Sequence, residues 1–144
     1  MSREIPKFRA WVKDLKEYRV VASIHYVLMN KEWTTIPSYV TLYGNKWADK
    51  DISRAIQDVV LEQSTGLEDK NGKEIWVGDI LKTCCGDMEV YFDDELLMYK
   101  IKAKHGGTMP LVSKKSKRHF DYEVIGNIHE NPELLGGWRM KEES

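Results

Sequence analysis

Residues 64–81 read STGLEDKNGKEIWVGDIL and decide the predicted fold of this 144-residue chain. Asn71 and Gly72 form the Asn-Gly pair typical of a two-residue hairpin loop, in which both residues take a positive φ. Gly78 and Asp79 mark a second tight bend. The segment EIWV between the two bends has the composition of a short strand. The stretch therefore predicts a β ribbon with two turns.

The residues of this ribbon are expected to serve the fold and not a reaction. Its structural signature consists of Gly66, Asn71, Gly72, Trp76, Gly78 and Asp79. We predict that the Trp76 indole turns inward, where truncation to alanine costs about 3–5 kcal/mol. A β-branched residue in place of Gly72 meets an unfavourable positive φ, at a cost of about 1–2 kcal/mol.

The same stretch resembles the signature of the YopX family of bacteriophage and prophage proteins. Residues 3–11, REIPKFRAW, are similar to the family's KFRAW opening, although Val12 stands where Asp is commoner and Pro6 is inserted. Residues 122–132, YEVIGNIHENP, are similar to its EVIGNIxENP close. The resemblance implies a β-rich fold with a small barrel, a phage or prophage origin and no established activity. It supplies no catalytic residues.

Length and charge set the first limits on function. A chain of 144 residues is expected to form one domain with a real core. Its 22 basic and 23 acidic residues give a net charge of −1, which argues against binding nucleic acid through bulk charge. Apolar runs are too short to span a membrane, and no signal peptide is expected.

The two cysteines, Cys84 and Cys85, are adjacent and cannot link distant segments. In a strand they would point to opposite faces, so a bridge between them would be strained and a packing role is expected. This pattern predicts the reducing cytoplasm of a bacterial host as the compartment.

In the N-terminal part, strands are expected over residues 7–12, 18–29, 32–36 and 39–43, with Pro37 ending the third. Alternate residues of the second strand are apolar and are expected to face the core: Val20, Ala22, Ile24, Tyr26 and Leu28. Residues 51–58 have the apolar spacing of a short helix, with Asp51 as its N-cap, although residues 59–61 also suit a strand.

In the C-terminal part, residues 80–83 and 88–92 are expected to form a hairpin closed near Gly86. Further strands are predicted over 97–103 and 122–128, separated by an open loop. Asn131 is expected to cap a helical turn that begins at Pro132.

These elements predict a mainly β fold of the β-rich α+β class. An N-terminal antiparallel sheet, about 1–63, packs on a small SH3-like barrel, about 64–131. Together they form a single YopX-like domain over residues 1–131, which has one short helix and a C-terminal helical turn. Residues 132–144 form a tail.

Candidate chemistry is sparse in this sequence. The four histidines are scattered without metal-ligand spacing. The acidic residues at 87 and 93–95 lie where turns favour Asp, and no nucleophile or phosphate-loop motif is present. We therefore expect no catalytic residues, no metal and no cofactor.

Two binding interpretations remain. Five tryptophans are many for this size, and exposed ones would mark a protein interface, with Trp138 and Trp33 as candidates. A basic run could contact nucleic acid through Lys114, Lys115, Lys117 and Arg118. The favoured hypothesis is a non-enzymatic phage or prophage accessory protein that acts through contacts with a host protein, a phage protein or its own copies. The alternative is a nucleic-acid-binding module, and no contact with a membrane is expected.

Overall fold

The structure is a computed structural model that describes residues 7–29, 34–112 and 121–135. These residues form a mainly β fold of antiparallel strands, with helical structure limited to short 3-10 turns. The chain divides into two compact units, residues 1–63 and 64–144. Each unit is described by itself.

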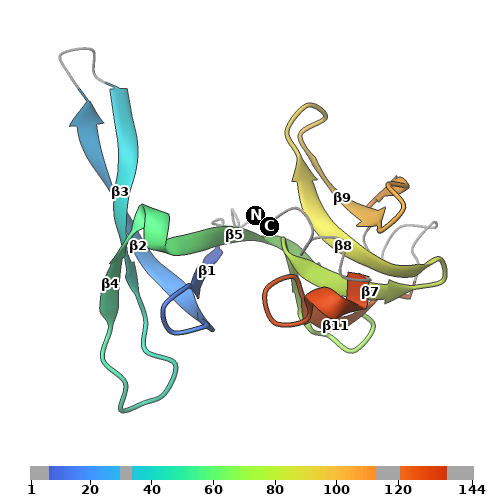
Figure 1. Cartoon of the computed structure of the whole chain (residues 1–144), viewed down its shortest axis with the longest axis horizontal. Helices are drawn as coiled ribbons and strands as arrows, with labels where there is room; N and C mark the ends of the chain where they lie inside the picture. Colours follow the sequence, from blue (N-terminus) through green and yellow to red (C-terminus); the bar gives the residue numbers. More distant parts are fainter. Residues whose placement is uncertain (1–6, 30–33, 113–120, 136–144) are drawn as a thin grey trace, which may run out of the picture. The chain divides into compact units, whose positions relative to one another are not determined.

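The first unit is built on one antiparallel sheet in the order β4-β3-β2-β1-β5 (Figure 1). Its elements are β1 (Phe8–Val12), β2 (Glu17–Met29), β3 (Thr34–Leu42), β4 (Ile52–Ala55), η2 (Ile56–Asp58) and the first half of β5 (Val59–Glu68). Its core consists of buried side chains from β1, β3 and β5: Ala10, Val12, Val40, Leu42 and Val59. Strand β5 leaves this unit after Gln63 and continues into the second.

Strand β2 corrects the predicted alternation of core residues. Val20 is 50% exposed and Tyr26 is also exposed, whereas Val21 and Ile24 pack against the core. The reason is a β-bulge opposite β3, where one extra residue, Ala22, separates the paired positions on either side. A bulge reverses which residues face inward, so the predicted face is wrong at Val20 and right at Ile24.

Strand β3 does not stop at Pro37, as the sequence predicted, but runs on to Leu42. Pro37 pairs with Tyr26 while Ser38 is skipped in the register with β2. Proline has no N–H to donate to a neighbouring strand, and a bulge is one of the places where a sheet accepts it.

The predicted helix over residues 51–58 is wrong. Residues Ile52–Ala55 form strand β4, which pairs with β3, and only Ile56–Asp58 form a single 3-10 turn. Ile52 and Ile56 still pack against the core. The apolar spacing therefore predicted correctly which side chains are buried. Pairing with β3 made the segment a strand and not a helix.

On the other face of this sheet, an ionic cluster joins β1, β2 and β5. The buried carboxylate of Glu62 accepts hydrogen bonds from Arg9 Nε at 3.1 Å and from the Tyr18 hydroxyl at 2.9 Å. The Arg9 guanidinium lies 4.0 Å from the Tyr18 ring centre, and Trp11 meets the same ring edge to face. These contacts offset the cost of burying the Glu62 carboxylate.

The second unit contains a sheet in the order β10-β9-β8-β7-β11 (Figure 1). Its elements are β6 (Glu74–Trp76), β7 (Asp79–Thr83), β8 (Gly86–Asp93), β9 (Met98–Ala103), β10 (Thr108–Pro110), β11 (Glu123–Asn127) and η3 (Pro132–Leu135). Strand β6 pairs with the second half of β5. Within the described residues the sheet has β10 and β11 as its edges, so closure into an SH3-like barrel stays a prediction.

The core of the second unit surrounds Ile75, which is fully buried between the two bends of the ribbon. The other core side chains are Leu81, Met88, Val90, Ile101, Leu111 and Tyr122. Trp76 is partly buried and does not belong to this core cluster, so its predicted role as the core side chain of the ribbon is not confirmed. Neighbouring residues of a strand face opposite ways, and here Ile75 faces inward.

The turn at residues 69–73 differs from the predicted two-residue loop. Among the described non-glycine residues only Lys16 and Leu97 take a positive φ, so Asn71 does not, whereas Gly72 has φ +82°. The Gly72 N–H donates to the Asp69 carbonyl, and the Asp69 N–H donates to the Lys73 carbonyl. This is a three-residue loop in which only glycine needs the left-handed region.

The other bends of the ribbon depend on glycines with positive φ and on a side chain that accepts a backbone N–H. Gly66 and Gly78 have φ of +76° and +93°, and the buried Asp79 carboxylate accepts the Trp76 N–H at 2.9 Å. The Asn131 side-chain oxygen accepts the Asn127 N–H at 3.3 Å, and its role as the cap of η3 stays a prediction. Across the described ranges, the chain has no helix that is long and apolar enough to cross a membrane.

Candidate interaction loop

The connection between β3 and β4, residues 43–51, combines a fixed backbone with a fully exposed tryptophan. We refer to it as the β3–β4 loop, and its sequence is YGNKWADKD. Trp47 has a relative accessible surface of 102%, and Tyr43 is also exposed. An indole that contacts nothing on its own chain is unusual in a soluble domain, where large apolar side chains gain free energy by burial.

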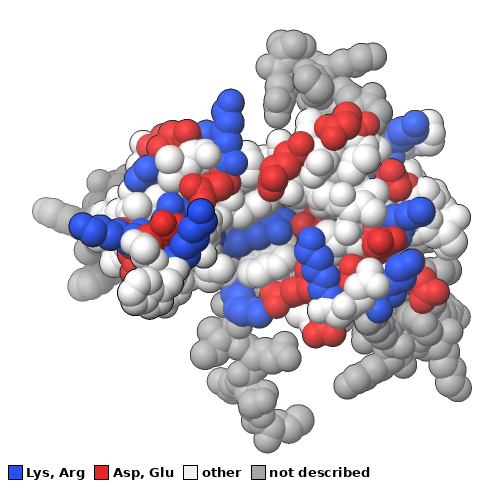
Figure 2. Space-filling model, turned by 90° about the horizontal axis from the view of Figure 1, so that it is seen from below, with Lys and Arg blue, Asp and Glu red and all other residues white. Residues whose placement is uncertain are grey.

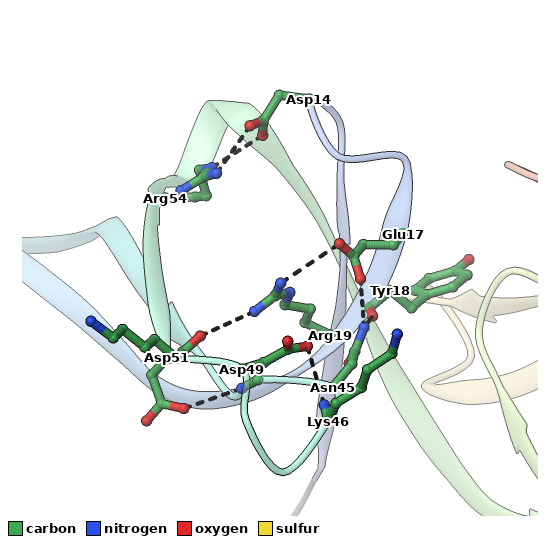
Figure 3. Close-up of polar contacts among 11 residues, drawn as sticks. Asp14, Glu17, Tyr18, Arg19, Asn45, Lys46, Asp49, Asp51 and Arg54 are labelled. Carbon is green, nitrogen blue, oxygen red and sulfur yellow. Dashed lines mark hydrogen bonds and ion pairs between the residues drawn. The ribbon is translucent and has the colours of Figure 1, made fainter.

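Aspartate side chains tie the loop to itself (Figure 3). The Asp51 carboxylate accepts the Gly44 N–H at 3.1 Å, and the Asp49 carboxylate accepts the Lys46 N–H at 3.2 Å. The Asp49 N–H donates in turn to the Lys46 carbonyl at 2.9 Å. These bonds satisfy backbone amides that would otherwise need water, and they define one loop conformation.

Three residues of β2 attach the loop to the sheet. Asn45 Nδ2 donates to the Glu17 carboxylate at 2.6 Å and to the Tyr18 carbonyl at 2.9 Å. Arg19 is 9% exposed, and its guanidinium donates to the Lys50 carbonyl at 3.4 Å and pairs with Glu17 at 3.6 Å (Figure 3). A buried cation beneath the loop therefore holds one of its carbonyls in place.

Gly44 lets the two ends of the loop cross closely. A Cβ atom at this position would lie 2.5 Å from the Asp49 carbonyl oxygen, which is a backbone atom that cannot move aside. Only glycine, which has no Cβ, lets residue 44 approach the Asp49 carbonyl this closely, so the shape of the loop depends on Gly44.

Beside the loop, an ion pair joins the β1–β2 turn to β4. Arg54 donates to both carboxylate oxygens of Asp14, at 3.1 and 3.0 Å, and this hydrogen bonding holds the pKa of Asp14 below its usual value. Together with Lys13 and Asp58 the pair lines a shallow pocket of about 470 Å³. A general acid at neutral pH needs a raised carboxyl pKa, so Asp14 is poorly suited to that role.

A second exposed apolar site occurs in the other unit, at the turn between β8 and β9. Leu96 and Leu97 are 63% and 76% exposed, and Leu97 has a φ of +53°. The Asp93 carboxylate accepts the N–H groups of Glu95 and Leu96, at 3.0 and 3.1 Å, and pairs with Lys100 at 3.3 Å. These backbone hydrogen bonds, with help from Lys100, lower the pKa of Asp93. This turn, residues 93–97, is called the β8–β9 turn.

Within the described ranges, no group of three or more His, Cys, Asp or Glu side chains is placed to hold a metal ion. Basic and acidic side chains are interspersed over the face drawn in Figure 2. A mixed surface of this kind gives no single-sign field for a polyanion.

The residues singled out from the sequence lie elsewhere. Trp33, Trp138 and the basic run (Lys114, Lys115, Lys117 and Arg118) fall outside the described residues. The sequence analysis missed Trp47 as an interface candidate. The signal was present, because this tryptophan stands between loop-forming residues, GNK before it and ADKD after it, with no strand pattern to bury it.

Comparisons with known proteins place the chain in a family. The model of the YopX family, described as YopX protein, matches residues 7–136. A crystal structure of protein EF1440 from Enterococcus faecalis is similar at 27% identity and a TM-score of 0.53, covering 92% of this chain and 99% of that one. Protein yopX from Bacillus subtilis has a similar fold at 16% identity and a TM-score of 0.51, covering 90% and 95% of the two chains. No curated protein matches. Because the family model covers most of the sequence, this chain belongs to the YopX family.

Proposed function

We propose that this protein is a non-enzymatic phage or prophage accessory protein that acts through protein contacts, with a second copy of itself as the partner of Trp47. The observation that carries the proposal is a fully exposed indole on a loop whose backbone is fixed by its own carboxylates. Tryptophan is among the residues that most often dominate binding energy at interfaces.

The order of the loop favours binding. A flexible loop loses conformational entropy when it is captured, whereas a loop already held in one conformation loses little. The attachment of Asn45 and Arg19 to the sheet and to the loop backbone provides this order before any partner arrives.

Charge complementarity supports a second copy as the partner. Beside Trp47 the loop exposes two basic side chains, Lys46 and Lys50. The exposed carboxylates of Asp49 and Asp51 keep their charge, but each accepts a backbone N–H of the loop. At the β8–β9 turn the exposed leucines stand beside the exposed acids Asp94 and Glu95. A basic-flanked indole on one copy therefore matches an acid-flanked leucine pair on another. Such a head-to-tail contact builds rings or longer assemblies.

Trp47→Ala tests the contact directly. We expect association to weaken about 30-fold, the loss of roughly 2 kcal/mol typical of an interface hot spot, as measured by sedimentation or light scattering over a concentration series. Leu15→Ala, at another partly exposed apolar residue, is the matched control. Wild-type protein that stays monomeric at high concentration would contradict self-association.

Charge reversal identifies the second side of the contact. One variant carries Lys46→Glu and Lys50→Glu, and the other carries Asp94→Lys and Glu95→Lys. Each alone repels its own copies, while a mixture of the two restores opposite charges at every junction. Association that recovers only in the mixture supports the proposed pairing, and no recovery rejects it.

The alternative function is a nucleic-acid-binding module, favoured by the basic run at residues 114–118. It predicts binding that weakens steeply as salt rises. The double variant Lys115→Glu and Arg118→Glu should abolish retention on DNA and RNA. Unchanged retention would remove this alternative.

The antiparallel order of β10, β9, β8, β7 and β11 supports an opened SH3-like barrel in the second unit. The exposed thiols Cys84 and Cys85 support the cytoplasm of a bacterial host as the compartment. We place no catalytic group, metal or cofactor in the proposed function.

A further inference from the structure

The tip of the hairpin between β7 and β8 displays two adjacent thiols on the second unit. Thr83 and Gly86 are the last paired residues of the two strands, so Cys84 and Cys85 form a two-residue loop. Both are exposed, and their sulfur atoms lie 3.5 Å apart. Their exposure in a turn corrects the expectation that the two cysteines pack within a strand.

The turn itself brings the sulfur atoms together. Gly86 has a φ of +101°, which only glycine adopts readily and which closes the two-residue loop. The Thr83 hydroxyl accepts the Cys85 N–H at 3.1 Å and donates to the Gly86 carbonyl at 2.8 Å. These contacts fix the backbone from which both thiols project.

Their geometry disfavours a direct disulfide. Bonded cysteines usually have Cα atoms at least about 4.4 Å apart. Adjacent residues joined by a trans peptide are held at about 3.8 Å, and the described chain has no cis peptide bond. A direct bond would also require the sulfurs to approach to about 2.05 Å.

A single metal ion bound by both sulfur atoms fits this geometry better than a direct disulfide does. Two thiolates on one tetrahedral zinc ion, each bound at about 2.3 Å, lie about 3.8 Å from each other. The observed sulfur separation of 3.5 Å needs only a small adjustment to reach that value.

From this fit we propose that Cys84 and Cys85 form a chelating dithiol site for a thiophilic divalent ion such as zinc or cadmium. The protein supplies two thiolates, and the remaining positions of the ion stay open to water or to an external ligand. On binding, both S–H bonds break, two metal–sulfur bonds form, and two protons leave to solvent.

The free thiols are consistent with proton release on binding. The Sγ···Sγ hydrogen bond with Cys85 raises the pKa of the Cys84 thiol, so the free protein carries this proton at neutral pH. An ion that displaces it gains two ligands from one rigid turn. Chelation of this kind exceeds the affinity of either single ligand by about 10²–10⁴.

Cadmium titration of the reduced protein tests the site, with isothermal calorimetry and thiolate-to-metal ultraviolet absorption as readouts. We expect one ion per chain, and about 100-fold weaker binding in each of Cys84→Ser and Cys85→Ser. Thr83→Val should weaken binding about tenfold by loosening the turn, whereas Thr108→Val, in β10, should leave it unchanged. Melting temperatures that match wild type show that the exposed-site variants remain folded.

Two results would overturn the proposal. One is cadmium affinity within about threefold of wild type in both single-serine variants, which would mean that the thiols act independently. The other is no cadmium-dependent absorption in the wild-type protein. Neither result depends on whether the protein self-associates through Trp47.

Discussion

Aspartate carboxylates hold the backbone in two parts of this protein, the turn at residues 69–73 and the β3–β4 loop, but the two carboxylate environments differ. In both, an aspartate carboxylate accepts backbone N–H groups of its own loop. Asp69 is 1% exposed, and it also accepts the Val124 N–H of β11 at 3.0 Å, so it joins the ribbon to the sheet. The carboxylates of Asp49 and Asp51 in the β3–β4 loop are exposed to solvent. The buried carboxylate of Asp69 therefore stabilises the fold. The exposed carboxylates of the β3–β4 loop only fix the local backbone that carries Trp47.

The largest expected effect comes from removing the buried carboxylate. Asp69→Ala leaves the N–H groups of Asn71, Lys73 and Val124 without their acceptor, and we expect a loss of about 3–5 kcal/mol in the free energy of unfolding. Asp49→Ala, in the exposed loop, should cost less than about 1 kcal/mol because water replaces the carboxylate. Urea denaturation of both variants measures the difference. Equal losses in the two variants would show that burial of the carboxylate does not determine its contribution to stability.

A smaller effect is expected at the glycine of each turn. Gly44→Ala places a Cβ against the Asp49 carbonyl oxygen and should cost about 1–3 kcal/mol by overpacking. At Gly72 a Cβ would meet only the Glu68 carboxylate, at 4.0 Å, so alanine is disfavoured mainly by the positive φ, at a cost of about 1 kcal/mol. Thermal melts of the two variants test this order. The reverse order would show that the β3–β4 loop yields to a side chain, contrary to a fixed loop.

The smallest effect concerns pH. In the folded state, hydrogen bonds from Arg54 hold the pKa of the Asp14 carboxyl below its ordinary value of about 3.8. A lowered folded pKa means that this pair stabilises the protein above about pH 4 and that the contribution disappears as pH falls through the folded pKa. Asp14→Asn should therefore reduce the melting temperature slightly at pH 7, and the reduction should shrink as the pH falls toward 2.5. A deficit that persists in acid would mean that the pair's geometry, and not its charge, matters.

Much of the fold could be predicted because strands carry local signals. The glycine and aspartate bends of residues 64–81 and the apolar alternation of most strands were sufficient for a mainly β fold. Errors arose where pairing with a neighbour overrode the local pattern. Ala22 opposite β3, Pro37 within β3 and the strand at Ile52–Ala55 all depend on which residue lies across the sheet.

The candidate sites were harder to predict for the same reason. Exposure is a property of the whole chain, so the isolation of Trp47 and the two leucines of the β8–β9 turn needed the structure. The approach of Cys84 to Cys85 followed from a hairpin that closes two residues earlier than the sequence suggested.

The sequence by itself determined the class of fold, the family and the positions of the tight bends, since glycine, aspartate and β-branched residues act on the backbone within a few residues of themselves. The tertiary structure alone decided strand register, the identity of Ile75 as the core residue of the ribbon, and which side chains face solvent. Register and burial arise from contacts between segments far apart in the chain, and a one-residue bulge is enough to exchange the two faces of a strand.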